Sequence, residues 1–198
     1  MSITHILGRR KIVLGSGSEG RKWLLRKWGW DFRVVKADVD EKNIRSDNPK
    51  HLTLSLAQRK REEILSSLLY EPTLLITSDT VIEKNGKILE KPTNEMEARS
   101  FFEEYQTSIV KAWTAIAVAD TLSGRCAEGV DSASIFFSSI PAEVVNKIVS
   151  KDETYCRAGG FTIEDPILEP YIEKIEGEKE TVTGLPKKLT IDLIKEVL

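Results

Sequence analysis

Apolar and polar residues alternate along the chain in blocks whose spacing predicts short strands and amphipathic helices. A short apolar strand is expected over residues 11–14, followed by a helix over residues 21–28 that Gly29 ends. A second strand is expected over residues 30–37. Apolar positions three or four residues apart then predict a long helix over residues 51–69.

The strongest strand signals lie in the middle of the chain. Residues 73–77 form a continuous apolar run, which is typical of a central strand covered on both faces. This strand is expected to end at residues 78–80, around Asp79. The Asn-Gly pair at 85–86 is the strongest turn signal in the chain and predicts a hairpin over residues 81–90.

The second half of the chain continues the alternation. Helices are expected over residues 94–105 and 141–150 and at the C-terminal end, and strands over residues 108–120, 125–138 and 171–175. This order predicts an α/β fold, and the hairpin predicts a mixed central sheet with flanking helices. Without an internal repeat, we expect a single domain over residues 1–198, with residues 1–10 as a loose leader. Trp23, Trp28 and Trp30 are expected in the core.

Composition and charge exclude several classes of function. The 198 residues are 40% hydrophobic and 30% charged, which describes a soluble globular protein with a sizeable core. A formal net charge of -2 indicates neither a nucleic-acid surface nor a membrane surface. Cys126 and Cys156 are too few for a disulfide framework, so we expect a cytoplasmic, reducing location. His5 and His51 lie far apart in the sequence, which argues against a histidine metal site.

The loop between the first strand and the first helix is a candidate anion site. Its Ser16, Ser18 and Arg21 can contact phosphate oxygens, and the helix N-terminus adds partial positive charge. Glycine and serine are also ordinary turn residues, so the loop by itself favours a plain connection over an anion site. It lacks the Gly-Lys-Ser/Thr ending of a Walker loop.

Carboxylates downstream could bind a metal or activate water. Asp79 is expected directly after a buried strand, at the end where α/β sheets bind ligands, although an aspartate there can also cap a turn. Glu41 lies in an acidic loop with Asp38 and Asp40. Oxygen ligands from two loops suit Mg²⁺. A solvated run of charge is the alternative, which we prefer for Asp38.

Two lysines are candidate phosphate ligands. Lys60 lies in a run of charged residues on a helix, so the local pattern favours the surface for it. Lys91 precedes a proline, which holds its backbone extended, and the hairpin is expected to bring it beside Asp79. An exposed lysine at a strand end is the alternative. Together these groups fit phosphoryl or nucleotidyl chemistry, which depends on positioning and charge neutralisation.

Seven motifs occur in order along the chain. They are LGSGSEGRKWLL (14–25), ADVDE (37–41), LAQRK (56–60), TSDTVI (77–82), GKILEKP (86–92), AGGF (158–161) and TGLP (183–186). In order and spacing they resemble the Maf family of nucleoside triphosphate pyrophosphatases. The resemblance covers nearly the whole chain, and seven motifs in order are far more specific than one.

The resemblance implies a fold with two lobes about a deep cleft, similar to inosine triphosphate pyrophosphatases. It implies hydrolysis of a nucleoside triphosphate to the monophosphate and pyrophosphate with Mg²⁺ or Mn²⁺, and a homodimer is typical of the family. By position it assigns phosphate binding to Ser16 and Arg21, an acidic role to Glu41, and catalytic roles to Lys60, Asp79 and Lys91. Lys60 is therefore expected in the site despite its surface-like surroundings.

The chain also departs from the family pattern. Glu19 and Gly20 replace the usual proline and the variable residue of the first loop, and Glu19 brings negative charge to an anion site. Glu164 resembles the branch acting on 7-methyl-GTP, whereas the dTTP/UTP branch has glutamine. The tryptophan typical of the former branch is missing at Gly20, so the base stays open. A catalytically weak nucleotide-binding protein linked to cell-division control is the alternative function.

Overall fold

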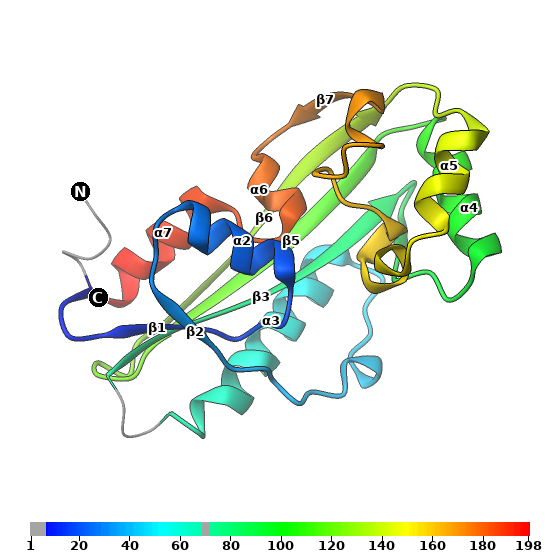
Figure 1. Ribbon diagram of the computed structural model, residues 1–198. Helices are drawn as coiled ribbons and strands as arrows, with labels where there is room; N and C mark the ends of the chain where they lie inside the picture. The colour runs from blue at the N-terminus through cyan, green and yellow to red at the C-terminus, as the bar shows by residue number, and fades with distance from the viewer. Residues whose placement is uncertain (1–6, 69–71) are drawn as a thin grey trace.

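The computed structural model describes residues 7–68 and 72–198, which form a mixed sheet with helices on both faces (Figure 1). In chain order the elements are β1 Lys11–Leu14, α2 Glu19–Lys27, β2 Phe32–Val34, α3 Pro49–Leu65, β3 Thr73–Lys84, β4 Lys87–Leu89, α4 Glu95–Tyr105, β5 Val110–Asp120, β6 Cys126–Phe137, α5 Ala142–Val149, β7 Ile172–Glu176, α6 Lys179–Thr183 and α7 Lys187–Val197. Short 3₁₀ turns lie at Glu41–Asn43, Asp152–Cys156, Ala158–Gly160 and Glu169–Tyr171.

The sheet has a parallel part and an antiparallel part. Its strand order is β2-β1-β3-β5-β6-β7, with β4 paired to β3 off this path. β1 runs parallel to both β2 and β3, whereas β3, β5, β6 and β7 pair antiparallel in sequence. The predicted α/β class and mixed sheet are therefore confirmed.

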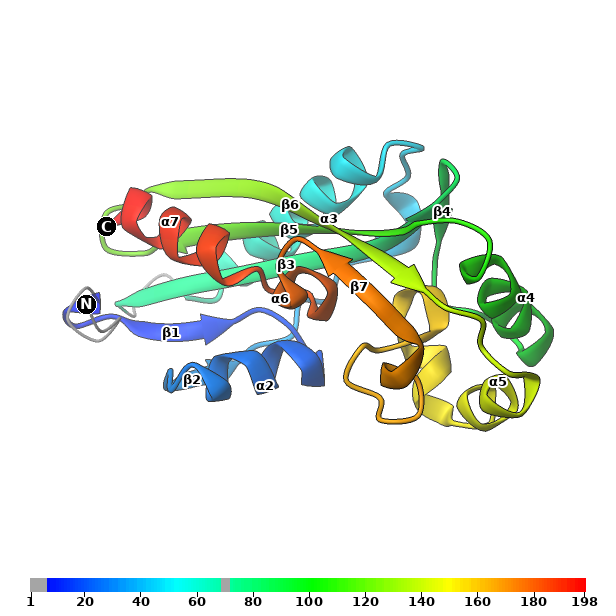
Figure 2. The ribbon, with the colours of Figure 1, turned by 90° about the horizontal axis from the view of Figure 1, so that it is seen from above.

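Alternate residues of β3 face two different layers. Leu74 and Ile76 pack in a core cluster with residues of α2 and α7, whereas Leu75 packs in a cluster with Ile64 of α3. Figures 1 and 2 show α3 on one side of the sheet and α2, α6 and α7 on the other. The continuous apolar run predicted for this strand is thus explained by cover on both faces.

β3 is much longer than its apolar run, which corrects one prediction. The strand was expected to end around Asp79, but it continues to Lys84 because β5 pairs with it through the register Lys84↔Val110. Asp79 therefore lies in mid-strand. The hairpin to β4 is confirmed: Asn85 and Gly86 have φ values of 50° and 79°, as a tight two-residue turn with left-handed residues requires.

Several boundaries near the N-terminus differ from the predictions. The helix predicted over residues 51–69 runs from Pro49 to Leu65, and residue 69 lies outside the described residues. The strand predicted over residues 30–37 is limited to β2. Trp23 is 45% exposed with the Lys27 ammonium 4.8 Å from its ring centroid, so it does not belong to the core, whereas Trp30 does.

Smaller differences occur near the two ends of the chain. In the predicted leader, residues 1–6 lie outside the described residues, and Arg10 is held by Asp120 at 2.6 and 2.8 Å. The short helix α6 was not predicted. Among the described residues, no helix is both long enough and apolar enough to cross a membrane.

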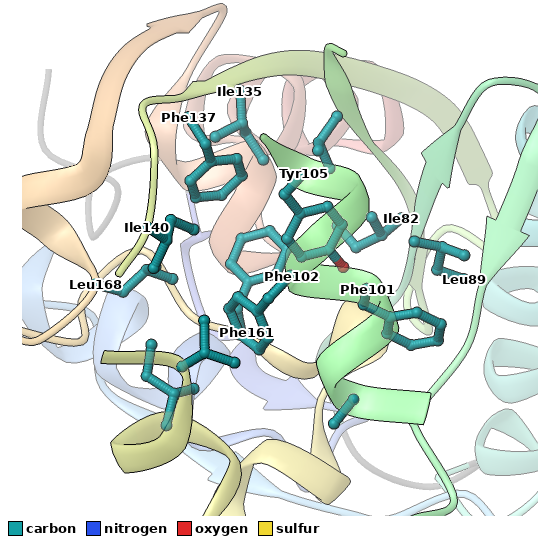
Figure 3. Close-up of a cluster of buried hydrophobic side chains, with 14 of the residues drawn as sticks. Ile82, Leu89, Phe101, Phe102, Tyr105, Ile135, Phe137, Ile140, Phe161 and Leu168 are labelled. Atoms are coloured by element: carbon teal, nitrogen blue, oxygen red, sulfur yellow. The ribbon is translucent and has the colours of Figure 1, made fainter. Parts of the chain in front are cut away.

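An aromatic cluster fills the end of the molecule formed by α4, α5 and the Gly-rich loop of residues 158–161 (Figure 3). The Tyr105 ring stacks on Phe137, with centroids 5.4 Å apart, and meets Phe102 and Phe161 edge to face. The buried Tyr105 hydroxyl donates to the carbonyl oxygen of Gly159 at 2.6 Å. This bond ties the Gly-rich loop to α4.

Candidate active site

The site is organised around an open stretch of the β3 edge. On this edge β1 pairs with β3 only as far as Ile76, and β4 pairs with it only from Ile82 onward. Among the described strands, residues 77–81 therefore have a strand partner only on the β5 side. We call this unpaired edge of residues 77–81 the gap. The loop that follows β1 and the segment that follows β4 approach the gap from its two ends, and Asp79 lies between them.

Asp79 lies in a cluster of three charged side chains, of which Asp79 and Lys60 are buried and Glu41 is exposed. Lys60 Nζ donates to Asp79 Oδ1 at 2.7 Å and lies 2.8 Å from Glu41 Oε1. Asp79 is 8% exposed and Lys60 is 9% exposed. Asp79 has the same strand parity as Leu75 and so faces α3, which carries Lys60. The surface position that the charged run favoured for Lys60 is therefore wrong, because its side chain is buried beside Asp79.

The two carboxylates of this cluster have opposite shifts in pKa. Burial raises the pKa of Asp79 above its usual value, although Lys60 and Arg21 oppose the shift. Burial also acts to raise the pKa of Glu41, but the hydrogen bond and charge of Lys60, with Lys91 and Arg21, bring it below its usual value. One acid is thus biased toward accepting a proton and the other toward staying ionised, a pattern found in catalytic carboxylate pairs.

Arg21 links the loop after β1 to the other face of β3. Its Nη1 donates to Ser16 Oγ at 2.9 Å, its Nη2 donates to Thr80 Oγ1 at 3.1 Å, and its Nε donates to the Gly184 carbonyl at 3.0 Å. Burial lowers the pKa of this guanidinium, while Asp79 and Glu41 favour its charged form. Ser16 and Arg21 therefore do come together, next to the strand that carries Asp79.

The loop of residues 15–20 presents several donors that the fold leaves unused. Ser18 is the N-cap of α2, and its own N–H donates to Ser16 Oγ at 3.2 Å. The N–H groups of Gly17, Glu19 and Gly20 donate to no acceptor within the described residues. Free N–H groups at a helix N-terminus favour an anion.

The unfavourable charge of Glu19 is neutralised locally. Its carboxylate pairs with Lys22 Nζ at 2.7 Å, one helical turn along α2. The pKa of Glu19 lies below its usual value, chiefly because of this hydrogen bond, with smaller effects of Arg26 and Lys36. The departure from the family pattern at Glu19 thus leaves the loop able to accept an anion.

Lys91 lies on the other side of the gap and is exposed. Its charge lowers the pKa of Glu41, whereas burial, Lys60, Arg21 and Glu41 set the shift of Asp79. Within the described residues Lys91 has no ion-pair partner. Among the residues that the structure describes, Lys91 acts on Glu41 and makes no contact with Asp79, so its predicted position beside Asp79 stays a prediction.

Sequence reasoning missed the polar groups that support Arg21. Ser78 and Thr80 have the strand parity that faces α2 and α6: Ser78 Oγ donates to the Gly184 carbonyl at 2.7 Å, and Thr80 Oγ1 lies 2.9 Å from Thr114 Oγ1. Gly184 ends α6 in a left-handed conformation with φ 104°, which favours glycine. The TGLP motif was the available signal, because its glycine holds Arg21.

Glu164 is linked to this network through Thr183. Thr183 Oγ1 donates to Glu164 Oε1 at 2.5 Å, and the Thr162 hydroxyl donates to the other carboxylate oxygen. A Cβ on Gly20 would lie 3.1 Å from Thr183 Cγ2. The close packing of α2 on α6 therefore explains the small residue at position 20. Through Thr183 it also brings the Glu164 side chain to the edge of the loop of residues 15–20, called the anion loop below.

In the acidic loop Asp38, Asp40 and Glu41 are all exposed, and Asp40 holds the turn that carries Glu41. Asp40 caps the 3₁₀ turn that contains Glu41, accepting from Lys42 N at 3.1 Å and from Asn43 Nδ2 at 2.7 Å. Asp38 is exposed, as expected for it. Glu41 and Asp79 are thus the carboxylates that this region brings together.

The comparisons with known proteins agree on one family for this chain. The family model described as "Maf-like protein" matches residues 11–197. The chain is 36% identical over 194 residues to a 7-methyl-GTP pyrophosphatase of Dictyostelium discoideum, covering 95% of this chain and 98% of that protein. It is 30% identical over 187 residues to a dTTP/UTP pyrophosphatase of Pelotomaculum thermopropionicum, covering 94% of this chain and 96% of that protein. The two relatives differ in the base that their names specify.

Proposed function

The chain belongs to the Maf-like protein family, and from this membership and the charged cluster on β3 we propose that it is a nucleoside triphosphate pyrophosphatase. It hydrolyses a nucleoside triphosphate to the monophosphate and pyrophosphate, as a house-cleaning activity on the nucleotide pool. The observation that carries the proposal is the buried Lys60, which joins Glu41 and Asp79 beside the gap where the anion loop ends.

The phosphates are proposed to bind along the loop after β1. Its free N–H groups, the Ser16 and Ser18 hydroxyls and the charge of Arg21 meet the phosphate oxygens, while Lys60 and Lys91 reduce the negative charge around the reacting phosphorus. Because Arg21 is held by three acceptors of the fold, its guanidinium needs little reorganisation when the substrate binds.

Asp79 is proposed to accept the proton of the attacking water. The water oxygen forms a bond to the α-phosphorus, the bond from that phosphorus to the bridging oxygen breaks, and pyrophosphate leaves with the bond's electron pair. The water proton passes to an Asp79 carboxylate oxygen. Burial raises the pKa of Asp79, which makes it a stronger base than an exposed aspartate.

A divalent cation, Mg²⁺ or Mn²⁺, is part of the proposal. Glu41 and Asp79 offer carboxylate oxygens, and Mg²⁺ is usually bound by one or two carboxylates together with substrate phosphates. Such an ion would neutralise phosphate charge and lower the pKa of a bound water. Lys60 contacts the same two carboxylates, so we expect its ammonium to compete with the ion. Mn²⁺ binding, followed by electron paramagnetic resonance with and without nucleotide, tests this directly.

We propose a guanine-type base, in particular 7-methylguanine, as the preferred base. Glu164 can accept hydrogen bonds from guanine N1–H and N2–H₂, and its negative charge favours a cationic methylated ring. Thr162 and Thr183 hold this carboxylate, which supports a fixed orientation. The 36% identity to the Dictyostelium protein points the same way.

The test is a panel of nucleoside triphosphates assayed for the products of hydrolysis. 7-methyl-GTP, GTP, dTTP, UTP and ITP are compared with Mg²⁺, with Mn²⁺ and with a chelator. We expect pyrophosphate and no free single phosphate, the highest kcat/KM for 7-methyl-GTP, and no reaction after chelation. Release of single phosphates would contradict the proposed bond cleavage. Tight nucleotide binding without any hydrolysis would favour the regulatory alternative.

A further inference from the structure

Lys36 reaches the anion loop from the strand next to it. β1 and β2 are parallel, with Leu14 paired to Val34, and the Val35 N–H donates to the Leu14 carbonyl at 3.1 Å. Adjacent parallel strands end at the same edge of a sheet. The chain after β2 therefore leaves the sheet beside the loop that follows β1, and Lys36 is the second residue beyond that strand.

The contact between Lys36 and the loop takes place at Gly17. A Cβ built on Gly17 would lie 2.9 Å from Lys36 Cε, 3.4 Å from its Cδ and 3.5 Å from its Nζ. The backbone of Gly17 is outside the left-handed region, so its conformation alone does not require glycine. The Lys36 side chain fills the space that a side chain at position 17 would take.

The ammonium group of Lys36 has no partner within residues 7–68 and 72–198. Glu19, whose pKa it influences, is already paired with Lys22. The N–H of Gly17, the residue that the Lys36 side chain contacts, also lacks an acceptor among the described residues. An unpaired cation against unpaired donors is the arrangement that binds an anion with several oxygens.

We propose that Lys36 is a further substrate-binding residue, one that contacts the outer phosphates of the nucleoside triphosphate. The inference rests on the proposed function, which puts the α-phosphate at Asp79. The two outer phosphates then extend along the loop, and Lys36 covers Gly17 at the middle of that loop. These phosphates leave as pyrophosphate and gain negative charge as the bond breaks, so a cation there stabilises both the bound substrate and the leaving group.

The first test uses inorganic pyrophosphate as the probe. Its binding to Lys36→Met, Lys36→Arg and wild-type protein is measured by isothermal titration calorimetry, with Lys195→Met on the last turn of α7 as the exposed-lysine control. We expect Lys36→Met to bind pyrophosphate about tenfold more weakly, because one hydrogen bond to a charged group is lost. Lys36→Arg should recover most of the lost affinity, and Lys195→Met should match wild type. Unchanged binding in Lys36→Met would overturn the inference.

The second test uses the contact at Gly17. Gly17→Ala puts a methyl group where Lys36 lies, so it should displace the ammonium and weaken pyrophosphate binding. In the Lys36→Met background the same substitution should have much less effect, because no ammonium is left to displace. Equal weakening in both backgrounds would mean that the methyl blocks the anion itself, and this would contradict the role assigned to Lys36.

Kinetic measurements distinguish a failure of the role of Lys36 from a failure of the proposed function. With nucleotide as substrate, Lys36→Met should raise KM about tenfold, with a smaller change in kcat, and added salt should reduce the difference from wild type. If the wild-type protein releases no pyrophosphate from any nucleotide, the proposed function fails. If the wild type is active and Lys36→Met has the wild-type KM, only the role of Lys36 fails.

Discussion

Asp79 and Ile82 lie three residues apart on β3 and both are buried, yet their surroundings differ in kind. Asp79 belongs to a polar band that also contains the buried Ser78 and Thr114. Ile82 belongs to the aromatic cluster around Tyr105 (Figure 3). Burial of aromatic rings stabilises a fold, whereas burial of charge costs free energy even when the charge is paired. We therefore expect stability to depend on the aromatic cluster and catalysis to depend on the polar band around Asp79.

The largest expected effect is the loss of turnover in Asp79→Asn. Without the carboxylate that accepts the proton, kcat should fall by about 10²–10⁴-fold. The free energy of unfolding should change little, because Lys60 keeps Glu41 as a partner. Initial rates of pyrophosphate release and urea unfolding measure the two effects. Asp192→Asn, an exposed acid on α7, is the matched control, and wild-type turnover in Asp79→Asn would break the comparison.

Next in size is the loss of stability in Phe102→Ala. Phe102 is 0% exposed in the aromatic cluster, and its truncation should cost about 3–5 kcal/mol of unfolding free energy. The remaining folded protein should keep its kcat, since Phe102 lies outside the charged cluster. Met96→Ala, 80% exposed on the same helix, should change stability by less than about 0.5 kcal/mol. A proportional loss of kcat in folded Phe102→Ala would show that the two regions are not separable.

The pH dependence of kcat/KM probes the polar band alone. Because the pKa of Asp79 is raised, it takes up a proton at a higher pH than an ordinary aspartate, and activity should fall about tenfold per pH unit below that pKa. Protonation of Asp79 should lower activity but stabilise the folded state. A raised pKa stabilises the folded state at low pH, and this stabilisation is lost as pH rises through the folded pKa. An acid limb in the ordinary aspartate range would contradict the assignment.

Glu41 and Asp120 should stabilise the folded state at higher pH, whereas Asp79 stabilises it at low pH. Their pKa values lie below the usual range, so their stabilising effect is present above the unfolded pKa and is lost as pH falls through the folded pKa. For Asp120, burial opposes the shift, and the hydrogen bond from Arg10 is the largest of the groups that lower the pKa. Urea unfolding at a series of pH values, with Asp120→Asn as comparison, measures this contribution.

The smallest expected effect is that of Tyr105→Phe, where the two regions meet. The substitution removes the hydroxyl that holds the Gly159 carbonyl, at a cost of about 0.5–1.5 kcal/mol. Because the Gly-rich loop leads to Glu164, the nucleotide KM should also rise slightly. Tyr155→Phe, whose hydroxyl bonds Val149 instead, should leave KM unchanged. Equal KM values in both variants would show that the loop needs no anchor on α4.

Most of the local structure could be predicted because its signals are local. β1 has the predicted bounds, and the Asn85-Gly86 turn forms as predicted. The end of β3 could not be predicted in this way. Ser78 and Asp79 are typical turn residues, and only the pairing with β5 keeps them extended.

The sequence by itself determined the order of the elements apart from α6, the mixed character of the sheet and, through motifs in a fixed order, the family. Only the tertiary structure decided which charges meet. Lys60 is one of several cations in a helical run, and its burial between Glu41 and Asp79 depends on how α3 packs on β3. Lys36 carries no local signal either, because its neighbour Gly17 lies in the loop that follows a different strand. Periodicity and turn chemistry act between residues close in sequence, whereas a site depends on pairings between strands and on packing between layers.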